Sequence, residues 1–232
     1  MSRELILNKI LERKAVSVIR LKDSGKLKKV IEALEQGGIT VAEITMTVPN
    51  AIDLIKKISN EVSENIIVGV GSVLNAKTAN EAIKAGAKYV VSPILKKEII
   101  ETSHENDIPV MPGCFTPSEI YNAYELGADI IKVFPADVLG MNFFKGVLAP
   151  MPFLKLMPTG GVTLTNVTDW LNAGAVAVGL GTSLLNKEAI ENENYDLLTQ
   201  NAKIITESIN QFLMKVKKWI SHSMILKTKL LL

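Results

Sequence analysis

The sequence has few of the residues that mark disulfide-rich and metal-binding proteins. Its 232 residues include one cysteine and two histidines. The single cysteine, Cys114, excludes an internal disulfide. His104 and His222 are too few for a histidine-ligated metal site, and no motif supports a magnesium site made of carboxylates. We therefore expect a protein that works without a metal or another cofactor.

The sequence also lacks a large excess of charge and a long hydrophobic run. Twenty-six basic against 24 acidic side chains leave a formal charge of +2, and no basic block stands out. This balance gives no sign of a nucleic-acid partner, so a small-molecule substrate is the better expectation. The first residues, "MSRELILNKILERK", predict an amphipathic helix without a signal-peptide core. The last, "WISHSMILKTKLLL", are too short and too interrupted by lysine to span a membrane, so we expect no membrane partner and a cytoplasmic location.

Eight short apolar runs indicate the fold. They recur about every 20–25 residues, and each is followed by a segment with helical periodicity. The runs are "AVSVI", "VAEIT", "IIVGV", "KYVVS", "IPVMP", "DIIKVF", "LKLMP" and "AVAVGL". Strands that alternate with helices predict an α/β fold, and eight of them favour a (β/α)8 TIM barrel over an open sheet.

Glycines mark the places where four of the predicted helices end. Gly38, Gly86, Gly127 and Gly174 each follow a helical segment and precede a strand. Glycine adopts the left-handed conformation that ends a helix and returns the chain to the sheet. These glycines are therefore interpreted as architectural.

The chain has no evident domain boundary before its last residues. No linker or change in composition interrupts residues 1–218, which are predicted to form one domain. Residues 219–232 depart from the β/α pattern and are predicted to be an exposed or poorly packed tail. A contact with another subunit or a surface is the alternative for this tail.

Two charged residues lie inside predicted buried strands. Glu43 is in "VAEIT" and Lys132 is in "DIIKVF", on the second and sixth predicted strands. A lone buried charge is costly unless it is paired or neutralised, and a neutral lysine amine is a nucleophile. The pair therefore predicts Schiff-base chemistry with a proton shuttle. The structural alternatives are a buried ion pair and a lysine that reaches solvent at the strand end.

Other polar residues are expected at the carboxyl ends of the predicted strands, where barrels place their active sites. Arg20, Thr45, Ser72 and Thr159 occupy such positions. Two glycine-containing loops follow the last two strands and could bind phosphate through backbone N–H groups, with tight turns as the alternative. The phosphate-binding candidates in these loops are Gly160, Gly161, Gly181 and Thr182.

Several remaining features are interpreted as structural. Thr116, Pro117 and Glu119 predict a capped helix start. Pro93 is expected to shape the rim of the pocket. Cys114 is expected to be packed rather than nucleophilic, because no histidine is placed to activate it.

The motifs together resemble the family of 2-keto-3-deoxy-6-phosphogluconate (KDPG) and 4-hydroxy-2-oxoglutarate (KHG) aldolases. The likeness extends from about residue 8 to about residue 215. It is carried by "GGITVAEITMTVP", "VGVGSVLN", "VSP", "MPGCFTPSE", "IKVFPAD" and "PTGGV", in the family's order. The resemblance implies a class I aldolase with a barrel fold, a homotrimer and no metal.

The resemblance also implies roles for individual residues. Lys132 matches the Schiff-base lysine and Glu43 the general acid/base. Ser72, at a position that is usually threonine, matches a contact to the pyruvoyl carboxylate. The implied pocket and phosphate-binding residues are Thr45, Pro93, Phe134, Thr159, Gly160, Gly161, Gly181 and Thr182.

Two positions bear on the substrate. Some family members hold the substrate carboxylate with an arginine where this chain has Thr47, whereas others supply the arginine from the end of the first strand, where this chain has Arg20. We therefore assign Arg20 to the carboxylate. Thr159 replaces the valine of galactonate-specific relatives, which favours a gluconate-type substrate.

The predicted reaction is cleavage of KDPG to pyruvate and glyceraldehyde 3-phosphate, or of 4-hydroxy-2-oxoglutarate to pyruvate and glyoxylate. Three alternatives stay open: an aldolase for the phosphogalactonate analogue, a phosphosugar isomerase or epimerase, and a phosphometabolite-binding protein without turnover.

Overall fold

Strands and helices alternate along the chain in the computed structural model, which describes residues 1–229. The described strands are β1 (Ala15–Ile19), β2 (Val41–Thr45), β3 (Ile67–Gly71), β4 (Val90–Val91), β5 (Val110–Met111), β6 (Gly113–Cys114), β7 (Ile131–Val133), β8 (Leu156–Pro158) and β9 (Val178–Leu180). The described helices are α1 (Arg3–Arg13), η1 (Ser24–Lys26), α2 (Leu27–Gln36), α3 (Ala51–Glu61), α4 (Ala76–Lys84), α5 (Lys97–Glu105), α6 (Pro117–Glu125), α7 (Ala136–Leu148), α8 (Val167–Asn172), α9 (Lys187–Glu191) and α10 (Tyr195–Lys229).

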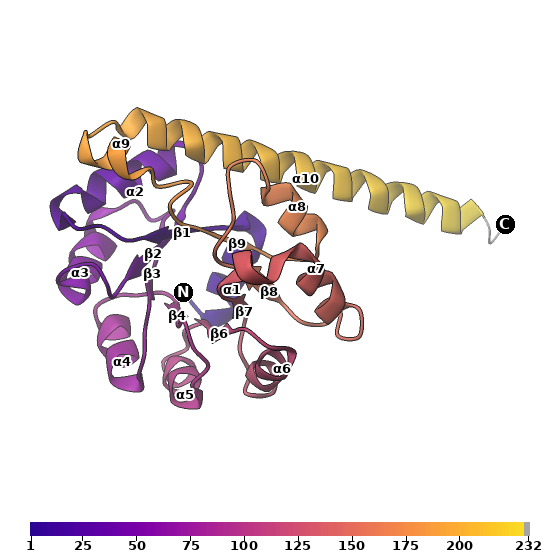
Figure 1. Ribbon diagram of the computed structural model, residues 1–232, viewed down its shortest axis with the longest axis horizontal. Coiled ribbons are helices and arrows are strands. Elements are labelled where there is room, and N and C mark those ends of the chain that lie inside the picture. The colour runs from indigo at the N-terminus through magenta and orange to yellow at the C-terminus, as the bar shows by residue number, and fades with distance from the viewer. Residues whose placement is uncertain (230–232) are drawn as a thin grey trace.

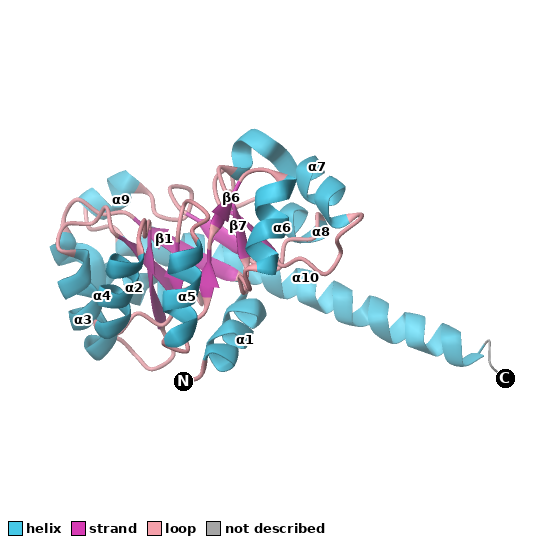
Figure 2. Ribbon diagram, turned by 90° about the horizontal axis from the view of Figure 1, so that it is seen from below, coloured by secondary structure: helices cyan, strands magenta, loops and turns pink. Residues whose placement is uncertain are grey.

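The strands form two parallel sheets that curl together inside a layer of helices (Figures 1 and 2). One sheet has the order β5-β4-β3-β2-β1-β9 and the other β6-β7-β8. Parallel strands need both faces covered, and every residue of the nine strands is buried. The predicted α/β fold is confirmed.

The fifth predicted strand differs from its expectation. The run "IPVMP" was expected to form one strand, but the structure has β5 and β6 on either side of Pro112. Proline has no backbone N–H to donate to a ladder, so it interrupts a strand. Its carbonyl still accepts a hydrogen bond from the Lys132 N–H at 2.9 Å. β5 pairs with β4, whereas β6 pairs with β7.

The predicted helix ends are confirmed. Gly38, Gly86, Gly127 and Gly174 have φ values of 92°, 112°, 87° and 102°, in the left-handed region that glycine adopts without strain. The capping box that begins α6 is also present, since Thr116 and Glu119 each bond to the other's backbone N–H.

The predicted N-terminal helix, α1, packs against the sheet through Ile6 and Ile10, which are fully buried. Its first residue is held by an ion pair in which Arg3 Nε donates to Asp129 Oδ1 at 2.8 Å. Asp129 also accepts from the Val110 N–H at 2.9 Å, so this carboxylate ties α1 to the edge of β5.

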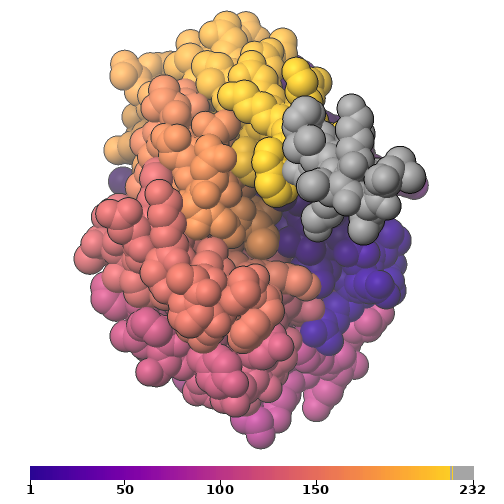
Figure 3. All heavy atoms as spheres, turned by 90° about the vertical axis from the view of Figure 1, so that its right-hand side faces the viewer, coloured from indigo at the N-terminus to yellow at the C-terminus, as the bar shows by residue number. Residues whose placement is uncertain are grey.

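The last helix, α10, is 35 residues long and contacts α2 and α8 before it projects beyond the body of the molecule (Figures 1 and 2). Figure 3 views the molecule from the side toward which this helix points, with its last described turns in yellow. It continues without a break past residue 218, and Trp219 is 72% exposed. Part of the predicted tail 219–232 is therefore helical, whereas residues 230–232 lie outside the described residues. The division of the chain at residue 218 stays a prediction.

Close packing of α10 on α2 depends on Gly37. A Cβ atom at this position would lie 2.3 Å from the Ala202 Cβ and 2.6 Å from the Thr199 carbonyl oxygen. Gly37 has φ −85°, which any residue can adopt, so only the contact requires glycine. The absence of a side chain here lets the two helices approach.

We therefore expect Gly37→Ala to destabilise the fold by about 1–3 kcal/mol, because the added methyl group meets backbone that cannot move freely. Gly146→Ala in α7 is the matched control, because a Cβ there has no neighbour within 4 Å. It should stabilise the protein by about 0.5–1 kcal/mol through helix propensity. Urea denaturation measures both changes, and equal effects of the two substitutions would contradict the role of Gly37.

Candidate active site

Lys132 and Glu43 lie on the inner face of the curled sheet. Lys132 is the middle residue of β7 and is 2% exposed, and Glu43 is the middle residue of β2 and is 1% exposed. Lys132 therefore does not reach solvent at the end of its strand, which removes one structural alternative. Its Nζ lies 5.1 Å from the centre of the Phe134 ring, within the range of a cation–π contact.

Glycines lie beside both charged residues on neighbouring strands, but only Gly71 makes room for a charged side chain. Lys132 is in register with Gly113 of β6, and Glu43 is in register with Gly69 of β3. The Glu43 side chain leans over Gly71, where a Cβ atom would lie 1.9 Å from its Oε1. Glycine is required at position 71 because the carboxylate occupies the space of a side chain.

Burial shifts the proton affinity of both groups. It raises the pKa of Glu43, while the positive charges of Lys132 and Arg20 oppose that shift. It lowers the pKa of Lys132, against the charge of Glu43 and together with the charge of Arg20. Desolvation favours the neutral form of each group, which gives a more nucleophilic amine and a carboxyl that can donate or accept a proton.

The two groups do not form a direct ion pair. Among the described residues, neither oxygen of Glu43 has a hydrogen-bond partner and Lys132 makes no salt bridge within 4.0 Å. A buried ion pair kept for stability needs close contact and saturated hydrogen bonding. Lys132 and Glu43 have neither feature in the described residues, so they do not form such a pair.

Arg20, Ser72 and Pro93 each follow the carboxyl end of a strand. Arg20 follows β1 and lines a cavity of about 250 Å³ together with Thr182. Its charge influences both Glu43 and Lys132. Ser72 follows β3 with a left-handed φ of 59°, and the backbone of Pro93 after β4 lies against Gly113.

Two further candidates, Thr45 and Thr159, are buried. The Thr45 hydroxyl donates to the Ile19 carbonyl at 3.0 Å, which ties the end of β2 to β1. Thr159 follows β8 and is 5% exposed, and its hydroxyl has no hydrogen-bond partner among the described residues. That hydroxyl is available to a ligand.

The two glycine loops differ in their surroundings. Gly160 and Gly161 have φ values of 100° and 71°, and Cβ atoms there would lie 2.8 Å and 2.7 Å from the side chain of Asp137. Turn geometry and packing therefore account for these two glycines. Gly181 has no neighbour within 4 Å of a Cβ position, and Thr182 is exposed, so the second loop is open to an anion.

Cys114 is packed, as predicted. It is 2% exposed, and burial together with the charge of Glu119 raises the pKa of its thiol to about 12. A thiol with this pKa is not a nucleophile at neutral pH. Within residues 1–229 no group of three or more acidic, histidine or cysteine side chains is arranged to hold a metal ion.

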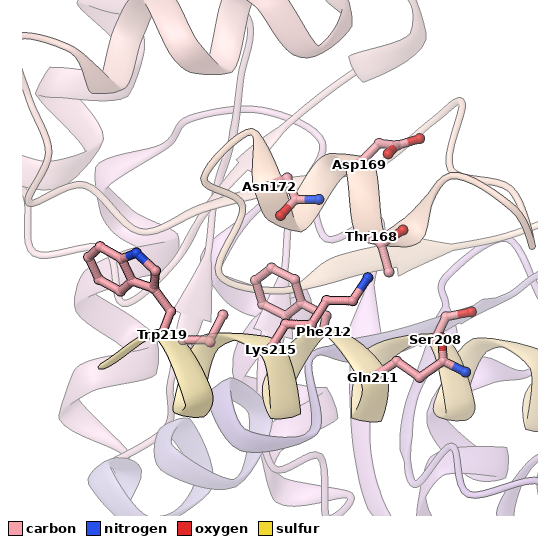
Figure 4. Close-up of a pocket in the computed structure, with 9 residues that line it drawn as sticks. Thr168, Asp169, Asn172, Ser208, Gln211, Phe212, Lys215 and Trp219 are labelled. Carbon is pink, nitrogen blue, oxygen red and sulfur yellow. The ribbon is translucent and has the colours of Figure 1, made fainter. Parts of the chain in front are cut away.

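A larger cavity lies elsewhere. It measures about 520 Å³ and runs between α8 and α10, where its lining includes Thr168 and Asn172 of α8 and Phe212, Lys215 and Trp219 of α10 (Figure 4). It contains neither buried charge of the sheet interior. In the part of the chain that the structure describes, no helix combines the length and apolar character needed to cross a membrane.

Sequence reasoning missed Tyr89, which lies just before β4. Its ring is fully buried on the inner face of the sheet, and its hydroxyl has no partner among the described residues. A Cβ atom at Gly69 would lie 2.4 Å from this ring. The motif "VGVG" could have indicated this residue. Its two glycines are two residues apart on a strand, so they lie on the same face and leave space there for large side chains of neighbouring strands.

Comparison with known proteins agrees with this geometry. The family model described as KDPG and KHG aldolase matches residues 6–201. The chain belongs to this aldolase family. It is 33% identical to the 2-dehydro-3-deoxy-phosphogluconate aldolase of Pseudoalteromonas atlantica over 81% of this chain and 87% of that protein. It is also 33% identical to the KHG/KDPG aldolase of Escherichia coli (strain K12), over 83% and 90% of the two chains.

The aldolase also resembles solved structures. A KDPG aldolase from Legionella pneumophila, with pyruvate captured as a covalent carbinolamine, superposes with a TM-score of 0.80. That structure is 28% identical, and the match covers 86% of this chain and 97% of the other. The aldolase is therefore a carbon–carbon lyase of a family in which pyruvate forms a covalent intermediate.

The contact between Gly71 and Glu43 gives a testable prediction. Gly71→Ala should displace the carboxylate and lower aldol cleavage on the order of 100-fold, the usual cost of misplacing a reacting group by about 1 Å. Steady-state cleavage and thermal unfolding should be measured together, with Gly146→Ala as the control. Cleavage within threefold of the unaltered aldolase would show that the position of Glu43 does not matter.

Proposed function

We propose that this aldolase cleaves KDPG to pyruvate and glyceraldehyde 3-phosphate, and 4-hydroxy-2-oxoglutarate to pyruvate and glyoxylate, with Lys132 as the Schiff-base residue. The observation that carries the proposal is the buried, unpaired couple of Lys132 and Glu43 on opposite strands of one interior. No metal or other cofactor is needed, because the iminium ion formed on Lys132 accepts the electrons of the breaking bond.

The first half of the reaction forms the covalent intermediate. The neutral amine of Lys132 attacks the C2 carbonyl, and Glu43 carries the amine proton to the carbonyl oxygen, which gives a carbinolamine. Glu43 then protonates the carbinolamine hydroxyl, which leaves as water. The product is an iminium ion that joins C2 to Lys132 Nζ, and Glu43 is left as a carboxylate.

The second half breaks the carbon–carbon bond. The Glu43 carboxylate takes the proton of the C4 hydroxyl, directly or through water. The C3–C4 bond then breaks, the aldehyde leaves, and the electron pair passes into the iminium to form an enamine. Protonation at C3 and hydrolysis release pyruvate and restore Lys132.

The remaining residues are proposed to hold the substrate. Arg20 and Ser72 bind the pyruvoyl carboxylate, and Phe134, Pro93 and Thr45 shape the pocket around Lys132. Gly160, Gly161, Gly181 and Thr182 bind the phosphate of KDPG through backbone N–H groups and a hydroxyl. The open Gly181–Thr182 loop and its cavity shared with Arg20 support this arrangement.

We propose that the two sheets close into an eight-stranded barrel in which β5 and β6 count as one strand. Hydrogen bonds cross the first seam, from Asp129 N–H to Val110 O and from Lys132 N–H to Pro112 O. At the second seam a parallel bridge pairs Thr159 with Gly179. Closure supports the proposed function because it directs both charged side chains into one interior.

Substrate and assembly each have a finer proposal. Thr159 supports the gluconate series over the galactonate series. A phosphosugar isomerase would use Glu43 as a base without a covalent bond to Lys132, and family membership supports the aldolase instead. The homotrimer that the resemblance implies and the cytoplasmic location that the sequence predicts both stay predictions.

Borohydride trapping tests the proposed function. With pyruvate, reduction should give a mass increase of one pyruvate-derived group per chain, located by peptide mapping at Lys132. Lys132→Ala should lose both the adduct and cleavage. Glu43→Gln should slow cleavage yet still form some adduct, because the nucleophile remains.

A chelator is the matched control and should leave cleavage unchanged. Cleavage without any adduct that can be trapped at Lys132 would overturn the Schiff-base assignment and favour a non-covalent role for the lysine.

Arg20→Ala should raise the KM for pyruvate in aldol synthesis far more than the KM for the aldehyde. Loss of a hydrogen bond to a charged group costs about 1.5–3 kcal/mol, which is about 10- to 150-fold in affinity. Arg20→Lys keeps the charge without the two-pronged geometry and should recover only part of the loss. A KM for pyruvate within twofold of the unaltered value would reject the assignment, and a selective loss of phosphorylated aldehydes would move Arg20 to the phosphate.

A further inference from the structure

Tyr89 shares one level of the sheet with Glu43. Glu43 is in register with Gly69 on β3, and Val70, the next residue, is in register with Val90 on β4. The Val70 N–H donates to the Tyr89 carbonyl at 3.0 Å, which fixes Tyr89 beside Gly69. Three adjacent strands thus contribute Glu43, a glycine and Tyr89 to one row.

Two glycines on β3 leave room for the side chains of Tyr89 and Glu43. Gly69 and Gly71 are two residues apart, so they face the same side of the sheet, about 7 Å apart. The Tyr89 Cζ lies 2.4 Å from a Cβ position at Gly69, and the Glu43 Oε1 lies 1.9 Å from a Cβ position at Gly71. The phenol end of Tyr89 and the carboxylate of Glu43 therefore lie over neighbouring positions of the same strand.

Both side chains have unused hydrogen-bonding groups. Tyr89 is 0% exposed and Glu43 is 1% exposed, and among the described residues the Tyr89 hydroxyl and both Glu43 oxygens have no partner. Buried polar groups in folded proteins normally have a partner. Burial and the charge of Glu43 raise the pKa of Tyr89 well above its ordinary value, so its phenol stays protonated and can donate.

We propose that Tyr89 is a positioning residue that donates a hydrogen bond, relayed by ordered water, to the ionised carboxylate of Glu43. Ordered water is the link because the two groups are not in direct hydrogen-bond contact. The inference rests on the proposed role of Glu43 as the acid/base. The bond holds the carboxylate in place at the stage where Glu43 has released its proton and must take one from the C4 hydroxyl.

The charged and titratable groups that face Glu43 come from three sides. Lys132 from β7 and Arg20 from the end of β1 oppose its raised pKa, and Tyr89, just before β4, faces it across β3. A hydrogen bond to the ionised form lowers the pKa of a carboxyl group. Loss of the phenol hydroxyl should therefore raise the pKa of Glu43 in the complex.

The test is the pH profile of single-turnover KDPG cleavage by Tyr89→Phe. The acid limb of the profile should move to higher pH by about 0.5–1 unit, which lowers the rate on that limb by about 3- to 10-fold. Borohydride trapping of pyruvate should stay within twofold, because Lys132 is unchanged. Tyr195→Phe is the matched control: its hydroxyl is also buried without a partner, but it begins α10, and its removal should leave the profile unmoved.

A double-mutant cycle with Glu43→Gln separates this inference from the proposed function. Glutamine does not ionise, so in that background Tyr89→Phe should change cleavage by less than twofold. A large loss from Glu43→Gln with an undiminished further loss from Tyr89→Phe would overturn the positioning role. No loss from Glu43→Gln alone would instead overturn the proposed function.

A second variant keeps the test valid if Tyr89→Phe unfolds. Incorporation of 3-fluorotyrosine at position 89 alone keeps the side chain and makes its phenol a stronger donor. The acid limb should then move to lower pH, opposite to the effect of phenylalanine. An acid limb that stays in place with 3-fluorotyrosine would contradict the inference.

Discussion

Removal of two opposite charges from water is the constraint on which this site depends. Glu43 and Lys132 are buried in a mostly apolar interior, and neither charge has a direct ionic partner among the described residues. Desolvation lowers the pKa of a lysine and raises the pKa of a carboxyl group. Burial of these groups is unfavourable, but it shifts their pKa values in the direction that the proposed chemistry needs. The close packing of the surrounding strands offsets this loss of stability.

Neighbouring strands hold Lys132 and Glu43 in place through close packing and backbone hydrogen bonds. Glycine at position 71 leaves the space that the Glu43 carboxylate occupies, whereas Gly113 and Gly69 leave space for the Pro93 backbone and the Tyr89 ring. Pro112 breaks the fifth strand where its carbonyl bonds to the Lys132 N–H, so the lysine backbone is held although the ladder is interrupted. Helices and helix-ending glycines then bring each strand back to the same sheet. In the proposed mechanism the reacting side chains therefore sit on the strands, and the loops at the strand ends bind the substrate.

Much of this could be predicted from the sequence, because local patterns carried it. The β/α alternation, the four glycine helix ends, the capping box of α6 and the two charged residues within apolar strands all depend on residues close together in the chain. The split at Pro112, the continuation of α10 and the contact of Tyr89 with Gly69 were not predicted. These features depend on strand register and on packing between distant segments. Gly160 and Gly161 show the same limit, since their closeness to Asp137 follows from how two loops meet in space.

Strand β3 has a consequence for how the sequence can change. Positions 69 and 89 share one volume, because the ring of Tyr89 occupies the place of a side chain at Gly69. A larger residue at 69 therefore requires a smaller one at 89, and neither change is acceptable by itself. We therefore expect positions 69 and 89 to change together during evolution, so that the residue at one position limits which substitutions the other can accept.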